Sequence, residues 1–82
     1  EKLNTWSFIR TFDHNALIDE LAWHRDENGR YITILEGEGW EFQFDEKLPK
    51  KLNKGDRFFI PAKTFHRIKR GNTDLKIKIE EF

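Results

Sequence analysis

The sequence contains no cysteine, no methionine, only two prolines, and no excess of charge of either sign. Without cysteine, disulfides, thiolate metal sites and cysteine nucleophiles are all excluded. Fifteen basic and fifteen acidic residues cancel, so no net field attracts the chain to nucleic acid or to a membrane, and we expect neither as a partner. The apolar runs are far shorter than the roughly 20 residues of a membrane-spanning helix. Because no charged and apolar signal segment opens the sequence, a cytoplasmic protein is expected.

The sequence is rich instead in aromatic and charged residues. Eight Phe and three Trp help to bring the aromatic share to 15%, and charged residues make up 37% of the 82 positions. Large rings supply much buried area per residue, so this composition suits a small aromatic core under a charged surface. The length predicts one domain, residues 1–82. A chain this short often gains stability from a bound metal or a second subunit when no disulfide is available.

Short segments of alternating apolar and polar residues recur along the chain, and turn residues separate them. The clearest is 30–36, where β-branched Ile32, Thr33 and Ile34 follow Tyr31. The other predicted strands are 6–12, 21–25, 40–44, a short one near 51–52, 57–61, 65–70 and 74–80. Seven or eight short strands without a long helical pattern predict an all-β sandwich or barrel.

The same pattern predicts turns and faces. Asn28-Gly29 is the pair that most easily takes positive φ, so a turn is expected there. Trp40, Phe42 and Phe44 alternate and are expected on the core face of their strand. The alternating lysines of 74–80 are of the kind that protects an exposed sheet edge, and we interpret them so.

A first group of residues has a spacing that points to chemistry. His24 and Asp26 lie two residues apart, so an extended chain presents both side chains on one face. Arg30 follows four residues after Asp26, and Gly37 follows seven residues after Arg30. His14 lies in a turn away from this group and is interpreted as a surface residue.

A second group lies later in the chain. Gly55 is followed by five residues and Pro61, and His66 comes after four more residues. A glycine turn, a strand, a proline and a histidine that opens a new strand predict a hairpin. Such a hairpin can direct His66 toward the same interior as the first group.

The order and spacing of the two groups resemble the two motifs of the cupins, which are small β-barrels of the jelly-roll or double-stranded β-helix type. The resemblance covers about residues 18–79 and implies that fold. Cupins typically hold a divalent metal with three histidines and a glutamate. His24 and His66 match two of these ligands, whereas Asp26 stands at the second histidine and Arg30 at the glutamate.

Three further positions depart from the cupin motifs. Ile18 stands where the first motif opens with a glycine, Lys63 where the second motif has a glycine, and Arg70 where it has an asparagine. The departures concern function more than fold, because the spacing of both motifs is kept.

The remaining two imidazoles and one carboxylate match the ligand set that binds ferrous iron and leaves coordination positions open. His24, Asp26 and His66 are therefore candidate ligands of a divalent metal in a small-molecule pocket, with iron, manganese, nickel or zinc as candidates. Arg30 cannot be a ligand, because a guanidinium stays protonated and has no acceptor. It is predicted to bind the carboxylate or phosphate of a small-molecule ligand. Any catalysis would be metal-assisted oxidation or isomerisation of a small polar molecule, and no catalytic residue is identified.

Two other interpretations of the same residues stay open. Arg30 could pair with Asp26 beside a histidine, which would satisfy these polar groups without an ion. The pocket would then recognise a sugar or an acid as a non-catalytic binding or sensor module. The third interpretation is a degenerate barrel that serves assembly alone.

The faces of the strands also predict a subunit contact. If the pocket residues face the interior, alternation places Ile32 inside the barrel and Tyr31 and Leu35 outside it. An outward face with large apolar side chains indicates a covered surface, and we expect a homodimer. Trp6 and Phe8 are expected to pack on this face as a strand exchanged between subunits.

Overall fold

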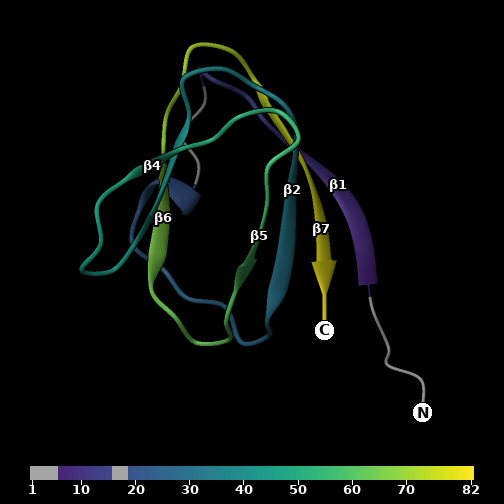
Figure 1. The fold of residues 1–82 in the computed structure, drawn as a ribbon, viewed down its shortest axis with the longest axis vertical. Helices are drawn as coiled ribbons and strands as arrows, with labels where there is room; N and C mark the ends of the chain where they lie inside the picture. The colour runs from purple at the N-terminus through teal and green to yellow at the C-terminus, as the bar shows by residue number, and fades with distance from the viewer. Residues whose placement is uncertain (1–5, 16–18) are drawn as a thin grey trace.

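The computed structural model describes residues 6–15 and 19–82, and two antiparallel sheets face each other in it (Figure 1). The larger sheet has the order β1 (Trp6–Phe12), β7 (Leu75–Glu81), β2 (Arg30–Glu36) and β5 (Arg57–Ile60). The smaller has the order β4 (Lys50–Lys51), β3 (Glu41–Phe44) and β6 (His66–Lys69). A short 3-10 helix, η1 (Asp19–Leu21), follows β1. The predicted all-β class is confirmed, and no helix in the described part of the chain could span a membrane.

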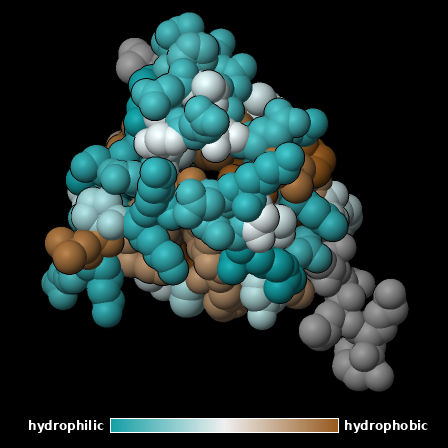
Figure 2. All heavy atoms as spheres, turned by 45° about the horizontal axis from the view of Figure 1, so that its top comes forward, coloured by the Kyte–Doolittle hydropathy of each residue, from teal (hydrophilic) through white to brown (hydrophobic). Residues whose placement is uncertain are grey.

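The core lies between the two sheets. Trp40 is fully buried, Phe42 is buried, and Phe44 packs partly buried against them, which confirms the core face predicted for this segment. The outside is largely hydrophilic on the face seen in Figure 2, where hydrophobic surface shows between hydrophilic residues. The buried hydrophobic residues are Phe12, Ile32, Ile34, Trp40, Phe42, Leu52, Ile60, Ile68, Leu75, Ile77 and Ile79.

The last strand, β7, is central in its sheet. It pairs with β1 on one side and with β2 on the other, so the prediction of an exposed edge strand is wrong. Leu75, Ile77 and Ile79 are buried toward the core, and Lys76 and Lys78 alternate with them on the outer face. The lysines therefore reflect a solvated sheet face, a pattern that sequence alternation alone does not distinguish from edge protection.

Two local predictions near the first motif are wrong. Residues 21–25 form no strand, because only His24 makes a bridge, and its partner is His66. Asn28-Gly29 does not take positive φ. The bend there joins a crossing segment to β2 instead of joining two paired strands, so the hairpin geometry that needs positive φ is absent.

The outward face of β2 is covered by aromatic side chains of the same chain. The ring of Tyr31 lies 4.9 Å from that of Phe59 and 5.6 Å from that of Phe82. Phe8 pairs with the buried Ile79, so the register of β1 places Trp6 and Phe8 on the inner face of the sheet, opposite Tyr31. Within one chain these aromatics do not meet, and strand exchange stays a prediction.

The segment 22–29 crosses between the sheets at the end of the barrel where β2 and β6 begin and β7 ends (Figure 1). This crossing brings the residues of the first motif to the beginning of β6. The polar residues at this end therefore come from both sheets and from the segment that joins them.

Candidate metal centre

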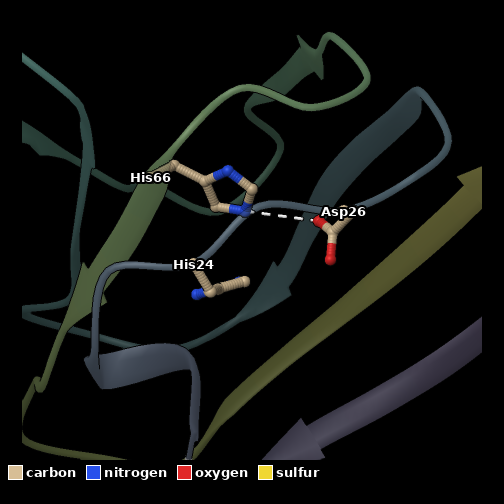
Figure 3. A group of neighbouring side chains, drawn as sticks. All are labelled: His24, Asp26 and His66. Carbon is tan, nitrogen blue, oxygen red and sulfur yellow. Dashed lines mark ion pairs between the residues drawn. The ribbon is translucent and has the colours of Figure 1, made fainter.

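His24, Asp26 and His66 come together at this end of the barrel, as the two motifs predicted (Figure 3). One ligand atom of each residue lies within 4.8 Å of the others. The backbones of His24 and His66 exchange two hydrogen bonds, of 3.0 and 2.9 Å, and their rings lie 4.4 Å apart in an edge-on arrangement. Two residues that are 42 positions apart in the sequence are therefore fixed side by side by main-chain pairing.

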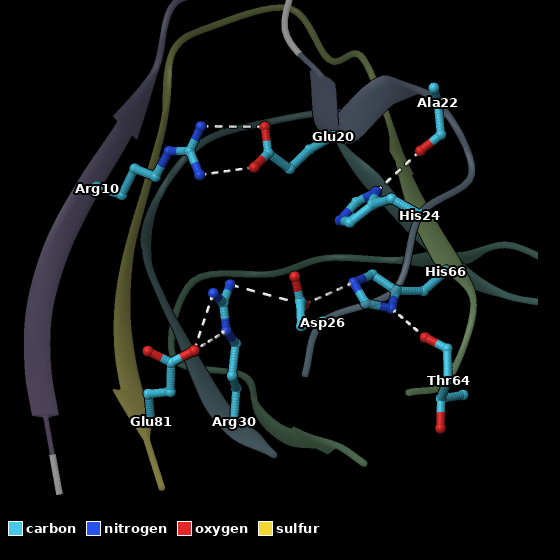
Figure 4. A network of polar contacts seen from close by, with 9 residues as sticks. All are labelled: Arg10, Glu20, Ala22, His24, Asp26, Arg30, Thr64, His66 and Glu81. Carbon is cyan, nitrogen blue, oxygen red and sulfur yellow. Dashed lines mark hydrogen bonds and ion pairs between the residues drawn. The ribbon is translucent and has the colours of Figure 1, made fainter. Parts of the chain in front are cut away.

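Backbone carbonyls orient both imidazoles. His24 Nδ1 lies 2.9 Å from the Ala22 carbonyl oxygen, and His66 Nδ1 lies 2.7 Å from the Thr64 carbonyl oxygen (Figure 4). A carbonyl only accepts hydrogen bonds, so Nδ1 carries the proton in each ring, and in the neutral form of the ring Nε2 has a free lone pair. This arrangement is typical of metal-binding histidines, whose second nitrogen is held by a carbonyl or a carboxylate.

His66 is the buried polar residue of the site, with 4% of its surface exposed. Its ring stacks on Phe42, with 5.4 Å between the ring centroids. Burial lowers the pKa of His66, because the charged imidazolium is poorly solvated there, and the Thr64 carbonyl opposes this effect only in part. The nearby charges of His24 and Arg30 lower this pKa further, whereas the Asp26 carboxylate raises it. A neutral imidazole is the form that binds a metal.

Asp26 directs a carboxylate oxygen at the buried imidazole. Its Oδ2 lies 3.4 Å from His66 Nε2 and 3.7 Å from Arg30 Nη1, and it is buried without a hydrogen-bond partner among the described residues. A carboxylate oxygen and an unprotonated Nε2 both present lone pairs, so a cation between them would satisfy both. The donor set therefore fits a divalent transition metal.

Arg30 is paired mainly with a residue that the sequence did not single out. Its Nε and Nη2 each lie 3.1 Å from Glu81 Oε2. Arg30 and Glu81 are direct partners across β2 and β7, so only the register of the sheet reveals the pair. The negative charge of Glu81 offsets the guanidinium charge, which would otherwise repel a cation bound at Asp26. The anion-binding role of Arg30 stays a prediction.

A family model for the cupin domain matches residues 8–79. The chain belongs to the cupin family. The match confirms the resemblance that the spacing of His24, Asp26, Gly55 and His66 carried. A search of curated proteins finds no match.

Two crystal structures show the same fold in other proteins. Protein NMB1881 from Neisseria meningitidis has a TM-score of 0.74 and 13% sequence identity, and the alignment covers all of this chain and 77% of that one. A cupin domain, bp2299, from Bordetella pertussis Tohama I has a TM-score of 0.68 and 15% identity, with 100% and 85% covered. At these identities the likeness shows the fold alone, and it supports the predicted cupin-type jelly roll.

The cupin barrel holds a small cavity beside the histidines. Its volume is about 50 Å³, and His24, Arg30 and His66 line it together with apolar core residues. One water needs roughly 10–15 Å³ by the same measure, so the cavity has room for only a few waters. At its border, Arg10 and Glu20 form a two-pronged ion pair with contacts of 2.6 and 3.0 Å (Figure 4).

A second group of polar residues lies on the surface of this cupin. Asp13, His14 and Asp74 bring one ligand atom each within 4.8 Å, and His14 Nδ1 lies 2.7 Å from Asp74 Oδ1. His14 lies on the surface, as its position in a turn predicted, with 38% of its side chain exposed. Nothing in the sequence indicated its contact with Asp74. Asp74 is distant in sequence, and only the pairing of Phe12 with Leu75 across β1 and β7 brings it beside the turn.

Proposed function

We propose that this cupin binds a divalent transition metal on His24 Nε2, the Asp26 carboxylate and His66 Nε2, and that a small polar molecule binds at the remaining coordination positions. The observation that carries this proposal is the buried Asp26 Oδ2, which faces His66 Nε2 without a hydrogen-bond partner among the described residues. Iron, manganese, nickel and zinc are the candidate metals. A bound metal would supply Lewis-acid or redox chemistry for oxidation or isomerisation.

Each residue of the site has a distinct part in this proposal. The Ala22 and Thr64 carbonyls hold the imidazoles with Nε2 directed inward. Asp26 supplies the negative charge, and its backbone is held by the 2.6 Å hydrogen bond from Lys63 N to its carbonyl oxygen. The cavity of about 50 Å³ favours a ligand of a few heavy atoms, or one that binds mostly outside the barrel end.

Calorimetric titration of chelator-treated protein with zinc or manganese tests the metal. We expect one ion per chain, with binding lost in His66→Gln. The matched control is His14→Gln, which alters the surface group and should keep full binding. If the parent binds no ion, or if His66→Gln binds as the parent does, the metal proposal is wrong and a metal-free pocket that pairs Arg30 with Asp26 is favoured.

We also propose a homodimer formed through the edge of β1. In the described part of the chain, β1 pairs only with β7 and exposes 72% of Trp6, 41% of Phe8 and 51% of Ile9. A long apolar edge strand tends to pair with another strand, and antiparallel pairing of β1 with its own copy is self-complementary. The expected cytoplasmic location stays a prediction.

Size-exclusion chromatography with light scattering tests the dimer. We expect twice the chain mass for the parent at micromolar concentration and a single chain mass for Ile9→Lys. Leu48→Lys is the control, because Leu48 is 89% exposed and lies far from β1 in the sequence. A monomeric parent would overturn the dimer proposal.

A further inference from the structure

Arg30 lies between the carboxylates of Asp26 and Glu81 and makes its closer contacts with Glu81. Its Nε and Nη2 each lie 3.1 Å from Glu81 Oε2, whereas its Nη1 lies 3.7 Å from Asp26 Oδ2 (Figure 4). Only the contact with Glu81 includes a hydrogen bond. The Asp26 and Glu81 side chains are 18% and 22% exposed, so solvent favours neither carboxylate strongly.

We infer that Glu81 is a positioning residue, which holds Arg30 away from Asp26 and so keeps the Asp26 carboxylate free for the metal. This inference rests on the proposed metal site. A guanidinium in a half-buried site pairs with whichever carboxylate remains, because leaving it unpaired is costly. Without the charge of Glu81, Arg30 turns to Asp26 Oδ2, occupies its lone pairs and places a positive charge beside the cation.

The charges of the site make this inference testable with a matched pair of proteins. The parent has two carboxylates and one guanidinium in Glu81, Arg30 and Asp26. Removal of both Arg30 and Glu81 charges leaves the same net charge and leaves Asp26 free. Removal of Glu81 alone leaves Asp26 and Arg30 to neutralise each other. Metal affinity should therefore depend on whether the Asp26 carboxylate is paired with Arg30, and not on the presence of Glu81 itself.

Calorimetric titration of zinc into chelator-treated Glu81→Gln, Arg30→Met and the double variant tests this role. We expect about 10–100-fold weaker binding in Glu81→Gln, the range found for residues that support metal ligands. The double variant should bind as tightly as the parent. The control is Glu80→Gln, because Glu80 lies next to Glu81 on the outer face of β7, pairs with Arg57 at 3.2 Å and should not affect binding.

Two results would overturn the inference and leave the proposed metal site intact. One is parent-like binding in Glu81→Gln, with binding still lost in His66→Gln. The other is binding as weak in the double variant as in Glu81→Gln, which would show that Glu81 acts without Arg30. A parent that binds no ion would overturn both proposals. If Glu81→Gln does not fold, the double variant still tests the inference, because binding weaker than that of the parent would show that Glu81 acts without Arg30.

Discussion

At the scale of single residues, Lys63 has a backbone conformation that glycine adopts at lower cost. Its φ is +60°, and it stands at the position where the second cupin motif has a glycine. The left-handed conformation strains a residue with a Cβ by roughly 1–2 kcal/mol, and glycine avoids this strain. Glycine in turn loses more conformational freedom on folding, which cancels about 0.5–1 kcal/mol of its advantage.

We therefore expect Lys63→Gly to stabilise the fold by about 0.5–1 kcal/mol, measured by urea unfolding. Lys63→Ala keeps the Cβ and the strain, so it should give no gain and serves as the control. Equal stability of the glycine and alanine variants would show that the left-handed backbone at Lys63 does not destabilise the fold.

Asp74 gives a pH dependence at the same scale. Hydrogen bonds from the His14 side chain and backbone lower the pKa of the Asp74 carboxyl below its ordinary value. The folded carboxylate therefore adds stability above the ordinary pKa of about 3.9, and this contribution is lost as the pH falls through the lower folded value.

Asp74→Asn should lack this contribution. The difference in urea midpoint between the parent and Asp74→Asn is expected to shrink as the pH falls from about 5 to below 3.9. Other carboxylates titrate in both proteins and cancel in the comparison. A difference that stays constant or grows over this range would contradict the account.

The residues of the site could be predicted from sequence only in part. His24, Asp26 and His66 were found because their spacing follows the two cupin motifs, which fix position along the chain. Glu81 was missed because its contact with Arg30 depends on the register of β2 against β7. Asp74 was missed for the same reason, since its partner is 60 residues away.

At the scale of elements, the core side chain of Trp40 packs directly against the turn at Gly71. A Cβ at Gly71 would overlap the Trp40 side chain and the Glu38 carbonyl oxygen, whereas a Cβ at Gly55 would meet nothing within 4 Å. Gly55 instead has a φ of +93°, which strains any residue with a Cβ.

Gly71→Ala should therefore cost about 3 kcal/mol or more, because the overlap includes backbone atoms that cannot rotate away. Gly55→Ala should cost about 0.5–1 kcal/mol, because the greater freedom of the unfolded glycine offsets part of the backbone strain. Urea unfolding measures both, and equal costs would contradict the packing described for this turn.

The strands show what alternation can and cannot predict. The alternation of apolar and polar residues correctly predicted the strands and the buried face of β2, because one face of each sheet covers the core. It wrongly predicted a strand at 21–25. The position of β7 at the centre of its sheet was predicted wrongly, since strand order depends on long-range pairing. The short bridge at His24 has too few residues to show a period.

At the scale of the whole molecule, the proposed metal site would join the crossing segment to the smaller sheet at this end of the barrel. His24 and Asp26 lie on the crossing segment, and His66 opens β6 of the smaller sheet. Binding of an ion to the folded chain alone stabilises it by mass action. A bound metal would supply the support that a chain of 82 residues without cysteine cannot draw from disulfides.

Anomalous diffraction from a zinc-loaded crystal tests the central claim most directly. The account predicts a strong peak at about 2.0–2.2 Å from His24 Nε2, His66 Nε2 and an Asp26 carboxylate oxygen. A map with no peak among these three residues, or with a peak only beside Asp13, His14 and Asp74, would contradict it.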